Sequence, residues 1–354
     1  MSQIGIVIPA YEPDQRLVTL LSNLSDHNIM PVIVVNDGSN ACFDDVFNQV
    51  HHILQGNQGV LLKHDKNLGK GRALKTAFAY LINNKPNIVG CITVDADGQH
   101  DIDSIRKVMQ ALMEHPNNLI LGTRNFNGEN IPWKSRMGNI ITEKIFSYTS
   151  GVHVTDTQTG LRGIPIEYMK ELLLVNGERF EFEMQMLLKS VNKYDITEIP
   201  IKTIYDSVEN HQTHFHPFRD SVKIYRLLLG KLVKYTISSL SACVIDLLLF
   251  SLLCSKLKNY NLNYYILLAT IGARVISVLY NYIINYKVVF SSSNKFHSTI
   301  LKYIGLAIAQ MIVSGMIVTL IATIMPLTNL VVLKILVDTC LFFVSYYIQQ
   351  RYIF

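Results

Sequence analysis

The first part of the chain alternates short apolar runs with longer stretches of helical spacing. Lys70 to Ile82 and Ile102 to Glu114 have the period of amphipathic helices. The apolar runs have the length and composition of strands. They are Ile4–Ile8, Pro31–Val35, Gly59–Leu62, Ile88–Val94 and Leu119–Leu121. This alternation predicts βα units and a mainly parallel sheet, so we expect an α/β domain over residues 1–210.

The second part of the chain is dominated by four apolar segments, each near the ~20 residues that cross a bilayer as a helix. They are Tyr235–Cys254, Leu262–Ile284, Ile300–Ile324 and Leu330–Ile348. Basic and apolar residues alternate between Ser221 and Lys234, which predicts an amphipathic helix at the membrane surface. We therefore expect a juxtamembrane segment over residues 211–234 and an all-α transmembrane domain of four helices over residues 235–354.

Charge separates the same two parts. The chain carries a net charge of +5, but from Lys231 onward ten basic residues face only two acids, and the first part is slightly acidic. This basic excess suits an anionic membrane surface, and without a basic run interleaved with aromatics we expect no nucleic-acid partner. Lys287, Lys295 and Lys302 lie between the second and third spans, which favours both termini on the cytoplasmic side.

Four charged residues fall within or near the predicted spans: Asp246, Arg274, Lys334 and Asp338. Unpaired charge is costly there, so a partner is expected, and we predict that Asp246 pairs with Arg274. The five cysteines are scattered without a C-x-x-C pair, which favours buried, reduced thiols. No charged leader precedes a long apolar stretch at the start, so no signal peptide is expected.

Polar or glycine-rich turns follow all five predicted strands. Because parallel strands place their carboxyl ends at one edge of a sheet, where ligands bind, these turns should lie together. The turns are Pro9–Glu12, Asn36–Ser39, Asn67–Arg72, Asp95–Asp97 and Gly122–Arg124. The sequence thus predicts a ligand site at this edge.

Asp95 and Asp97 end the fourth run one residue apart. Strand alternation places both carboxylates on the same side, where Mg²⁺ or Mn²⁺ could join them to diphosphate oxygens. An ordinary Asp-Gly turn is the alternative.

Two other turns also have a chemical and a structural interpretation. Asp37 could accept hydrogen bonds from a base or ribose, or form only an Asx turn. Lys70 could add charge to a helix N-terminus that binds an anion, or mark a helix entrance. The full P-loop spacing is missing, which disfavours a P-loop hydrolase.

The segments IPAYEP, VNDGS, NLGKGRALKTAF, VDADGQHD and GTR, in this order, resemble family 2 glycosyltransferases of the dolichyl-phosphate-mannose-synthase type. The resemblance implies a GT-A fold, a nucleotide-sugar donor, a divalent metal and inversion at the anomeric carbon. It places Asp95, Asp97 and Gln99 at the metal and diphosphate. It places Pro9, Tyr11, Glu12 and Asp37 around the nucleotide. Lys70, at its helix N-terminus, is a further candidate contact with the nucleotide-sugar.

The acceptor is indicated by the segment Asp156–Arg162 and by Arg124 and Arg136. Polyprenyl-phosphate glycosyltransferases carry a similar segment, and two arginines resembling Arg124 and Arg136 meet the acceptor phosphate in them. Arg162 is a further candidate cation, and Asp156 could orient the acceptor or donor, although surface ion pairs and a loop cap are the structural alternatives. A phosphate monoester is already anionic, so a strong base is not required.

Two further segments remain open. Glu181 and Glu183 lie on a predicted helix and could touch the sugar or be exposed acids. The histidines of His211–His216 lack metal-ligand spacing, so zinc is disfavoured, and their segment resembles one that could order over the donor.

The apolar part, including Ala273–Phe290 and the ending Gln350–Phe354, resembles the GtrA-like membrane family. Together the two resemblances imply a multi-pass membrane enzyme that moves one sugar from a UDP- or GDP-sugar onto a polyprenyl phosphate, undecaprenyl or dolichyl. The product would serve cell-envelope glycan decoration. The alternative is a translocation component for lipid-linked sugars whose front domain delivers cargo. Self-association of the spans is a further expectation.

Overall fold

The computed structural model describes residues 3–124, 133–191, 193–202, 217–258, 264–292, 294–324 and 329–354. The histidine segment from His211 to His216 therefore lies outside the described residues. The chain divides into two compact units. The first consists of Met1–Ser147 and Val152–Leu227, and the second of Tyr148–Gly151 and Leu228–Phe354.

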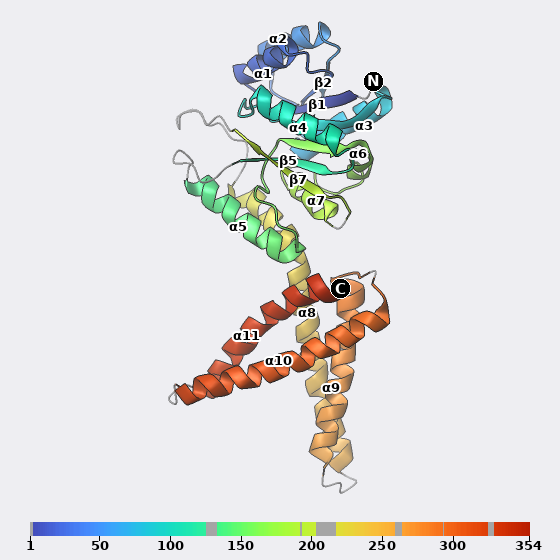
Figure 1. The fold of residues 1–354 in the computed structure, drawn as a ribbon, viewed down its shortest axis with the longest axis vertical. Helices are drawn as coiled ribbons and strands as arrows, with labels where there is room; N and C mark the ends of the chain where they lie inside the picture. Colours follow the sequence, from blue (N-terminus) through green and yellow to red (C-terminus); the bar gives the residue numbers. More distant parts are fainter. Residues whose placement is uncertain are drawn as a thin grey trace. The chain divides into compact units, whose positions relative to one another are not determined.

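The first unit is built on a seven-stranded sheet in the order β3-β2-β1-β4-β6-β5-β7 (Figure 1). Only β6 runs antiparallel to its neighbours among the described strands. The strands are β1 (Gln3–Ala10), β2 (Val32–Asn36), β3 (Val60–Lys63), β4 (Ile88–Thr93), β5 (Leu119–Arg124), β6 (Arg162–Pro165) and β7 (Ile196–Ile201). The five predicted strands are confirmed, whereas β6 and β7 had not been predicted.

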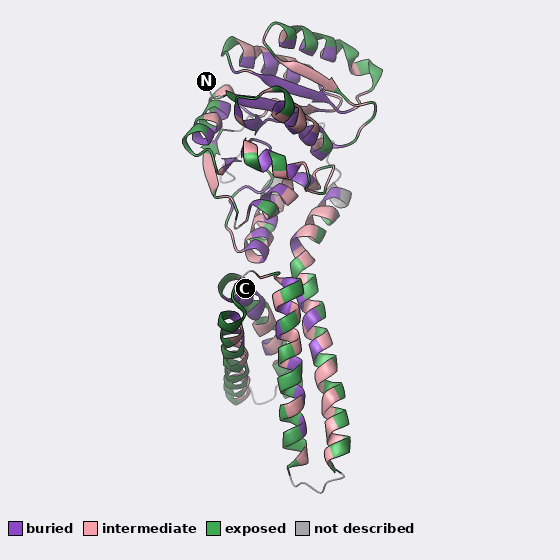
Figure 2. Cartoon of the chain, turned by 90° about the vertical axis from the view of Figure 1, so that its right-hand side faces the viewer, coloured by how far each residue is buried: buried purple, intermediate pink, exposed green. Residues whose placement is uncertain are grey.

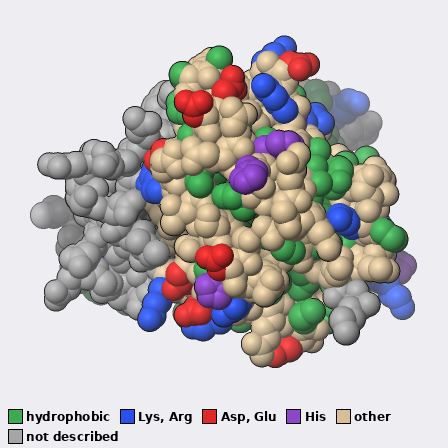
Figure 3. Space-filling model, turned by 90° about the horizontal axis from the view of Figure 1, so that it is seen from above, with side chains coloured by type: hydrophobic (Ala, Val, Ile, Leu, Met, Phe, Trp, Pro, Cys, Tyr) green, Lys and Arg blue, Asp and Glu red, His purple; other side chains and the backbone are tan. Residues whose placement is uncertain are grey.

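Helices cover both faces of this sheet. Ile4, Ile6 and Ile8 of β1 share one buried cluster with side chains of α1, α2 and α4. Because strand side chains alternate, Gly5 faces the other side, where it meets Leu81 of α3. The helices are α1 (Gln15–Asp26), α2 (Asp44–Gln55), α3 (Lys70–Asn84), α4 (Ile102–Glu114), α5 (Trp133–Ser150), α6 (Ile166–Leu172) and α7 (Glu181–Ser190), with a short 3₁₀ turn, η1 (Ala41–Phe43), before α2. Basic and acidic side chains are interspersed on the face seen from above (Figure 3).

The strand register brings the predicted turns to one edge of the sheet. Ala10 lies opposite Asn36, and Asn36 lies opposite Lys63, so β1, β2 and β3 end at the same level. Antiparallel β6 begins at this edge, where Arg162 lies opposite Thr93. The segment that precedes β6 is thereby brought beside the turn that follows β4.

The second unit contains long helices, of which the first begins with residues 217–227 of the first unit. Within the described residues, four helices are long and apolar enough to cross a membrane. They are α8 (Pro217–Lys258), α9 (Tyr265–Ile284), α10 (Phe296–Ile324) and α11 (Leu330–Ile348), and short π-helical turns, η2 (Asn285–Val289) and η3 (Gln349–Ile353), extend α9 and α11. The separately predicted surface helix and first span belong to the one continuous helix α8.

The charges predicted within the spans are paired. Arg274 Nη2 lies 3.3 Å from Asp246 Oδ2, so the predicted pair is confirmed, and the Ser277 hydroxyl also donates to Asp246. Lys334 and Asp338 form a second pair at 2.8 Å, one turn apart on α11. Pairing lowers the cost of these charges in a bilayer.

Candidate active site

The turns after β1 and β2 are joined by hydrogen bonds. The Glu12 amide donates to Ser39 Oγ at 2.8 Å, and the Asn40 side chain donates to Glu12 Oε1 at 2.6 Å. Pro9 is in β1 itself, opposite Val35. Slight burial and the Glu12 carboxylate raise the pKa of Tyr11. The structure thus brings Pro9, Tyr11 and Glu12 to the predicted edge, and their contact with a nucleotide stays a prediction.

Asp37 ties the end of β2 to the loop that precedes α3. Its carboxylate accepts from the amides of Leu68 at 2.9 Å and Gly69 at 2.7 Å, and His64 Nδ1 lies 2.7 Å away. The side chain is almost fully buried. Gly38 follows at φ +70°, where a Cβ would lie 2.1 Å from backbone carbon of Lys66. Asp37 therefore has a clear role in shaping this loop, and its nucleotide contact stays a prediction.

Lys70 begins α3 and lies between two carboxylates. Its Nζ is 2.7 Å from Asp95 Oδ1 and 3.0 Å from Glu183 Oε1. Glu183 is on α7, and its side chain is only 13% exposed. The interpretation of Glu183 as an exposed acid is therefore wrong, because its carboxylate faces the sheet edge and not solvent.

The charges at this edge change one another's pKa values. Burial alone would lower the pKa of Lys70, but Asp95 and Glu183 outweigh it and raise that pKa. Burial would raise the pKa of Asp95, but Lys70 outweighs it and lowers that pKa. Burial and the nearby Asp95 raise the pKa of Asp97. Pairs of acids with opposite shifts are common at functional sites.

The turn after β4 packs against the segment before β6. A Cβ on Gly160 would lie 2.1 Å from Asp95 Oδ2, so only glycine leaves room for this carboxylate. The Thr93 hydroxyl donates to the Gly160 carbonyl at 2.8 Å, which fixes the approach. On the same turn, Asp97 Oδ1 accepts from the Gln99 amide at 3.1 Å. The structure therefore brings the Asp156–Arg162 segment into contact with the two-carboxylate turn.

The residues of this turn fit a divalent ion that arrives with a diphosphate. No three His, Cys, Asp or Glu side chains of the described ranges are arranged to hold a metal by themselves. Mg²⁺, however, commonly takes one or two carboxylates and completes its shell with substrate phosphates and water. Asp95, Asp97 and Gln99 offer such oxygens. Beside them the ring of His100 is buried, and its Nδ1 has no hydrogen-bond partner among the described residues.

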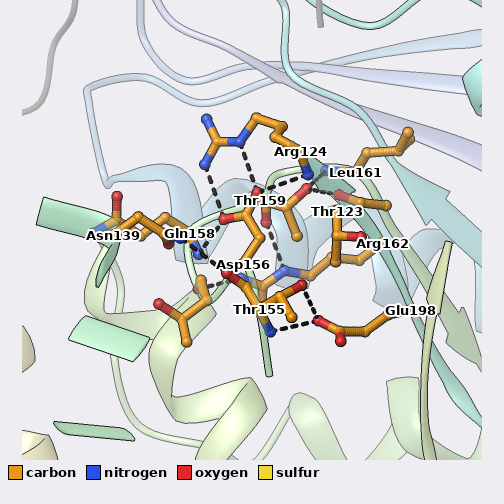
Figure 4. A network of polar contacts seen from close by, with 12 residues as sticks. Thr123, Arg124, Asn139, Thr155, Asp156, Gln158, Thr159, Leu161, Arg162 and Glu198 are labelled. Carbon is orange, nitrogen blue, oxygen red and sulfur yellow. Dashed lines mark hydrogen bonds and ion pairs between the residues drawn. The ribbon is translucent and has the colours of Figure 1, made fainter. Parts of the chain in front are cut away.

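Arg124 and Asp156 form a bidentate ion pair (Figure 4). Arg124 Nε donates to Asp156 Oδ2 at 2.7 Å, and Nη2 donates to Oδ1 at 3.0 Å. Asp156 is fully buried, and its Oδ1 also accepts from the Gln158 amide. Both carboxylate oxygens are thus engaged, which suits a residue that orients Arg124 better than a proton acceptor.

Arg162 and Arg136 differ sharply in exposure. Arg162 is fully buried, and its guanidinium donates to the carbonyls of Thr159 at 2.8 Å and Glu183 at 2.7 Å. Burial lowers the pKa of Arg162. Arg136 is exposed on α5, one turn before Asn139, which donates to the Thr155 carbonyl. Arg136 can meet an incoming anion, whereas Arg162 holds the loop and α7 together in this structure, and both acceptor roles stay predictions.

Comparison with known proteins agrees with this geometry. Residues 5–173 match the model of glycosyl transferase family 2. A UDP-N-acetylglucosamine–dolichyl-phosphate N-acetylglucosaminyltransferase of Methanococcus voltae is 30% identical over 217 residues, 57% of this chain and 86% of the relative. The chain belongs to glycosyltransferase family 2. The predicted family and its GT-A type of α/β domain are confirmed.

The second part of this family 2 glycosyltransferase also matches a family model, and further relatives are found. Residues 234–354 match the GtrA/DPMS transmembrane domain. A dolichyl-phosphate hexose transferase of Haloferax volcanii is 23% identical over 201 residues, 56% of this chain and 81% of the relative. A mannosyltransferase of Pyrobaculum calidifontis, solved with GDP-Man and Mn²⁺, aligns with 99% of this chain and 87% of its own at 10% identity and a TM-score of 0.41.

Sequence reasoning left Glu183 open and missed His100. Glu183 was named as a residue that could touch the sugar or be an exposed acid, and its spacing on α7 could not decide, because that spacing is also typical of an ordinary amphipathic helix. His100 directly follows Gln99 in the VDADGQHD segment, so its position in the motif could have pointed to it.

Proposed function

We propose that this family 2 glycosyltransferase transfers a single sugar, with inversion, from a UDP- or GDP-sugar to a polyprenyl phosphate. The observation that carries the proposal is the presence in one chain of a two-carboxylate strand edge and four membrane-length helices. The names of the Methanococcus and Haloferax relatives, both dolichyl-phosphate transferases, support the same acceptor class.

The chain's residues divide the work of this reaction. Asp95, Asp97 and Gln99 would hold Mg²⁺ or Mn²⁺, which supplies positive charge to the departing diphosphate. Lys70 adds a second cation at the same edge.

At the acceptor, Arg124 and the exposed Arg136 would receive the phosphate. A phosphate monoester is already ionised at neutral pH, so no side chain has to remove a proton from it. The engagement of both Asp156 oxygens supports such a base-free reaction, in which positioning and charge dominate.

The membrane helices and the charge pattern support a proposal for the location. We propose a multi-pass cell-membrane protein whose catalytic domain and both termini are cytoplasmic, because Lys287, Lys295 and Lys302 lie at or between the facing ends of the second and third spans. Domain bounds of 1–210, 211–234 and 235–354 and self-association through the spans remain predictions.

The test is transfer by the purified full-length protein in detergent. Labelled UDP-glucose, UDP-N-acetylglucosamine, UDP-galactose and GDP-mannose are each incubated with Mn²⁺ and undecaprenyl or dolichyl phosphate, and the lipid extract is counted. One donor should give a lipid-soluble product with the phosphate acceptor and none with the matching polyprenol. Asp97→Ala should reduce the rate by at least about 100-fold, while Asp103→Ala, an exposed acid on α4, should not. No product from any donor would favour the translocation alternative.

A further inference from the structure

Lys70 begins α3 and Glu183 lies on α7, and the starts of these two helices are in direct contact. The Arg72 amide donates to the Glu178 carbonyl at 3.0 Å, and a Cβ on Gly71 would lie 2.6 Å from Phe182 Cβ. The start of α3 is therefore hydrogen-bonded to the segment before α7 and packs directly against the start of α7. Asp95, the other partner of Lys70, belongs to a different element, the turn after β4.

The excess negative charge at this edge of the sheet equals the charge of one divalent ion. Among these side chains, the three acids Asp95, Asp97 and Glu183 exceed the one ammonium of Lys70 by two charges. The Lys70 ammonium, at 2.7 Å from Asp95 Oδ1, already stands where a cation would bind that carboxylate. Lys70 and a metal therefore compete for the same oxygen.

We propose that Glu183 is a positioning residue that holds the Lys70 ammonium while a divalent ion takes its place on Asp95, leaving Lys70 ready for the donor diphosphate. This inference rests on the proposed function. Glu183 can do this because it is 3.0 Å from Lys70 and lies on the helix that packs against the start of α3. Without Glu183, the displaced ammonium would be left in a largely buried position with no acid beside it, which is costly.

A purely structural ion pair predicts a different pattern of effects. Removing such a pair would weaken metal binding and nucleotide binding together, or change neither. Competition predicts effects of opposite sign, because Lys70 opposes the metal before the donor binds and supports the diphosphate afterwards. The double variant Lys70→Met, Glu183→Gln separates these cases, since it leaves the net charge of the site unchanged.

The experiment measures two affinities of the full-length protein in detergent. Mn²⁺ binding without nucleotide is followed by electron paramagnetic resonance, and UDP and GDP binding at saturating Mn²⁺ is followed by calorimetry. The double variant should bind Mn²⁺ about fivefold more tightly and the nucleoside diphosphate about tenfold more weakly. The matched control is Lys75→Met, Glu178→Gln, a pair at 3.1 Å between α3 and the segment before α7 that does not involve Asp95, and it should change neither affinity.

Each other result has a definite meaning. A folded double variant that binds Mn²⁺ no more tightly than the wild type overturns the inference. If the double variant does not fold, Glu183→Gln alone decides, because it keeps the shape of the side chain. Its Mn²⁺ binding should weaken about fivefold, and unchanged binding overturns the inference.

A wild type that binds neither UDP nor GDP with Mn²⁺ contradicts the proposed donor site and the inference with it. Normal wild-type binding with unaffected variants contradicts the inference alone.

Discussion

The first unit buries its apolar side chains in its interior, whereas the second unit exposes many of them on its surface. In the first unit Ile6 and Ile8 are fully buried inside the sheet layers, whereas in the second unit Leu247 is 62% exposed on α8. Figure 2 shows the same contrast, with buried strands in the first unit and largely exposed long helices in the second. Water drives the first arrangement through the hydrophobic effect. Lipid offers no such force between helices, so the second unit depends on other contacts.

Polar and aromatic side chains supply those contacts in the second unit. Asn285 is fully buried and donates to Gln349 Oε1 at 3.1 Å, and Gln349 donates to the Tyr235 hydroxyl at 3.0 Å. The Tyr282 hydroxyl lies 2.7 Å from Thr299 Oγ1, which joins α9 to α10. The contrast teaches that the same chain uses apolar packing where water surrounds it and polar contacts where lipid would.

The largest expected effect comes from truncating an apolar side chain, which we compare between the buried core of the first unit and the exposed surface of the second. Ile6→Ala should lower the free energy of unfolding of the first unit by about 2–5 kcal/mol, because it leaves a cavity in a closed core. Leu247→Ala should change stability by less than about 0.5 kcal/mol, because that side chain is exposed. Chemical denaturation in detergent, followed by circular dichroism, measures both changes. Equal losses in both variants would break the comparison.

A smaller effect is expected from the interior polar contact of the second unit. Asn285→Ala should destabilise this unit by about 1 kcal/mol, the usual size of a hydrogen bond between membrane helices. Thermal unfolding followed by circular dichroism measures it. Thr270→Ala, an exposed position on α9 whose hydroxyl bonds only within its own helix, is the control. A loss no larger than that of the control would show that the polar interior does not hold this unit together.

The smallest effect concerns an ion pair in water. Asp14 caps α1, and the hydrogen bond from the Arg16 side chain lowers the pKa of Asp14 below its ordinary value of 3.8. A lowered pKa means that the pair adds stability above pH 3.8 and loses it as the pH falls through the folded-state value. Asp14→Asn keeps a capping oxygen and removes the charge, so it should cost a few tenths of a kcal/mol at pH 7 and nothing at pH 2.

Thermal unfolding of both proteins at the two pH values tests this expectation. High salt should also remove the difference at pH 7, because exposed pairs are screened. A difference that persists at pH 2 would assign the effect to the cap and not to the charge.

Local patterns were enough to predict much of the fold and part of the site. The five apolar runs of the first unit became β1 to β5, and the four apolar segments became long helices, because alternation and hydropathy are properties of neighbouring residues. The turns that carry Asp37, Lys70 and Asp95 were placed correctly for the same reason, since strand direction alone puts them at one edge.

The sequence by itself determined five of the seven strands, the spans and the edge on which the chemistry lies. Only the tertiary structure decided how distant segments complete that edge: β6 runs antiparallel and brings Gly160 against Asp95, and α7 delivers Glu183 to Lys70. It also decided that Arg162 is buried and Arg136 exposed. The reason is physical: periodicity reports which face of an element is apolar, whereas contacts between residues far apart in the chain depend on the path of the backbone between them.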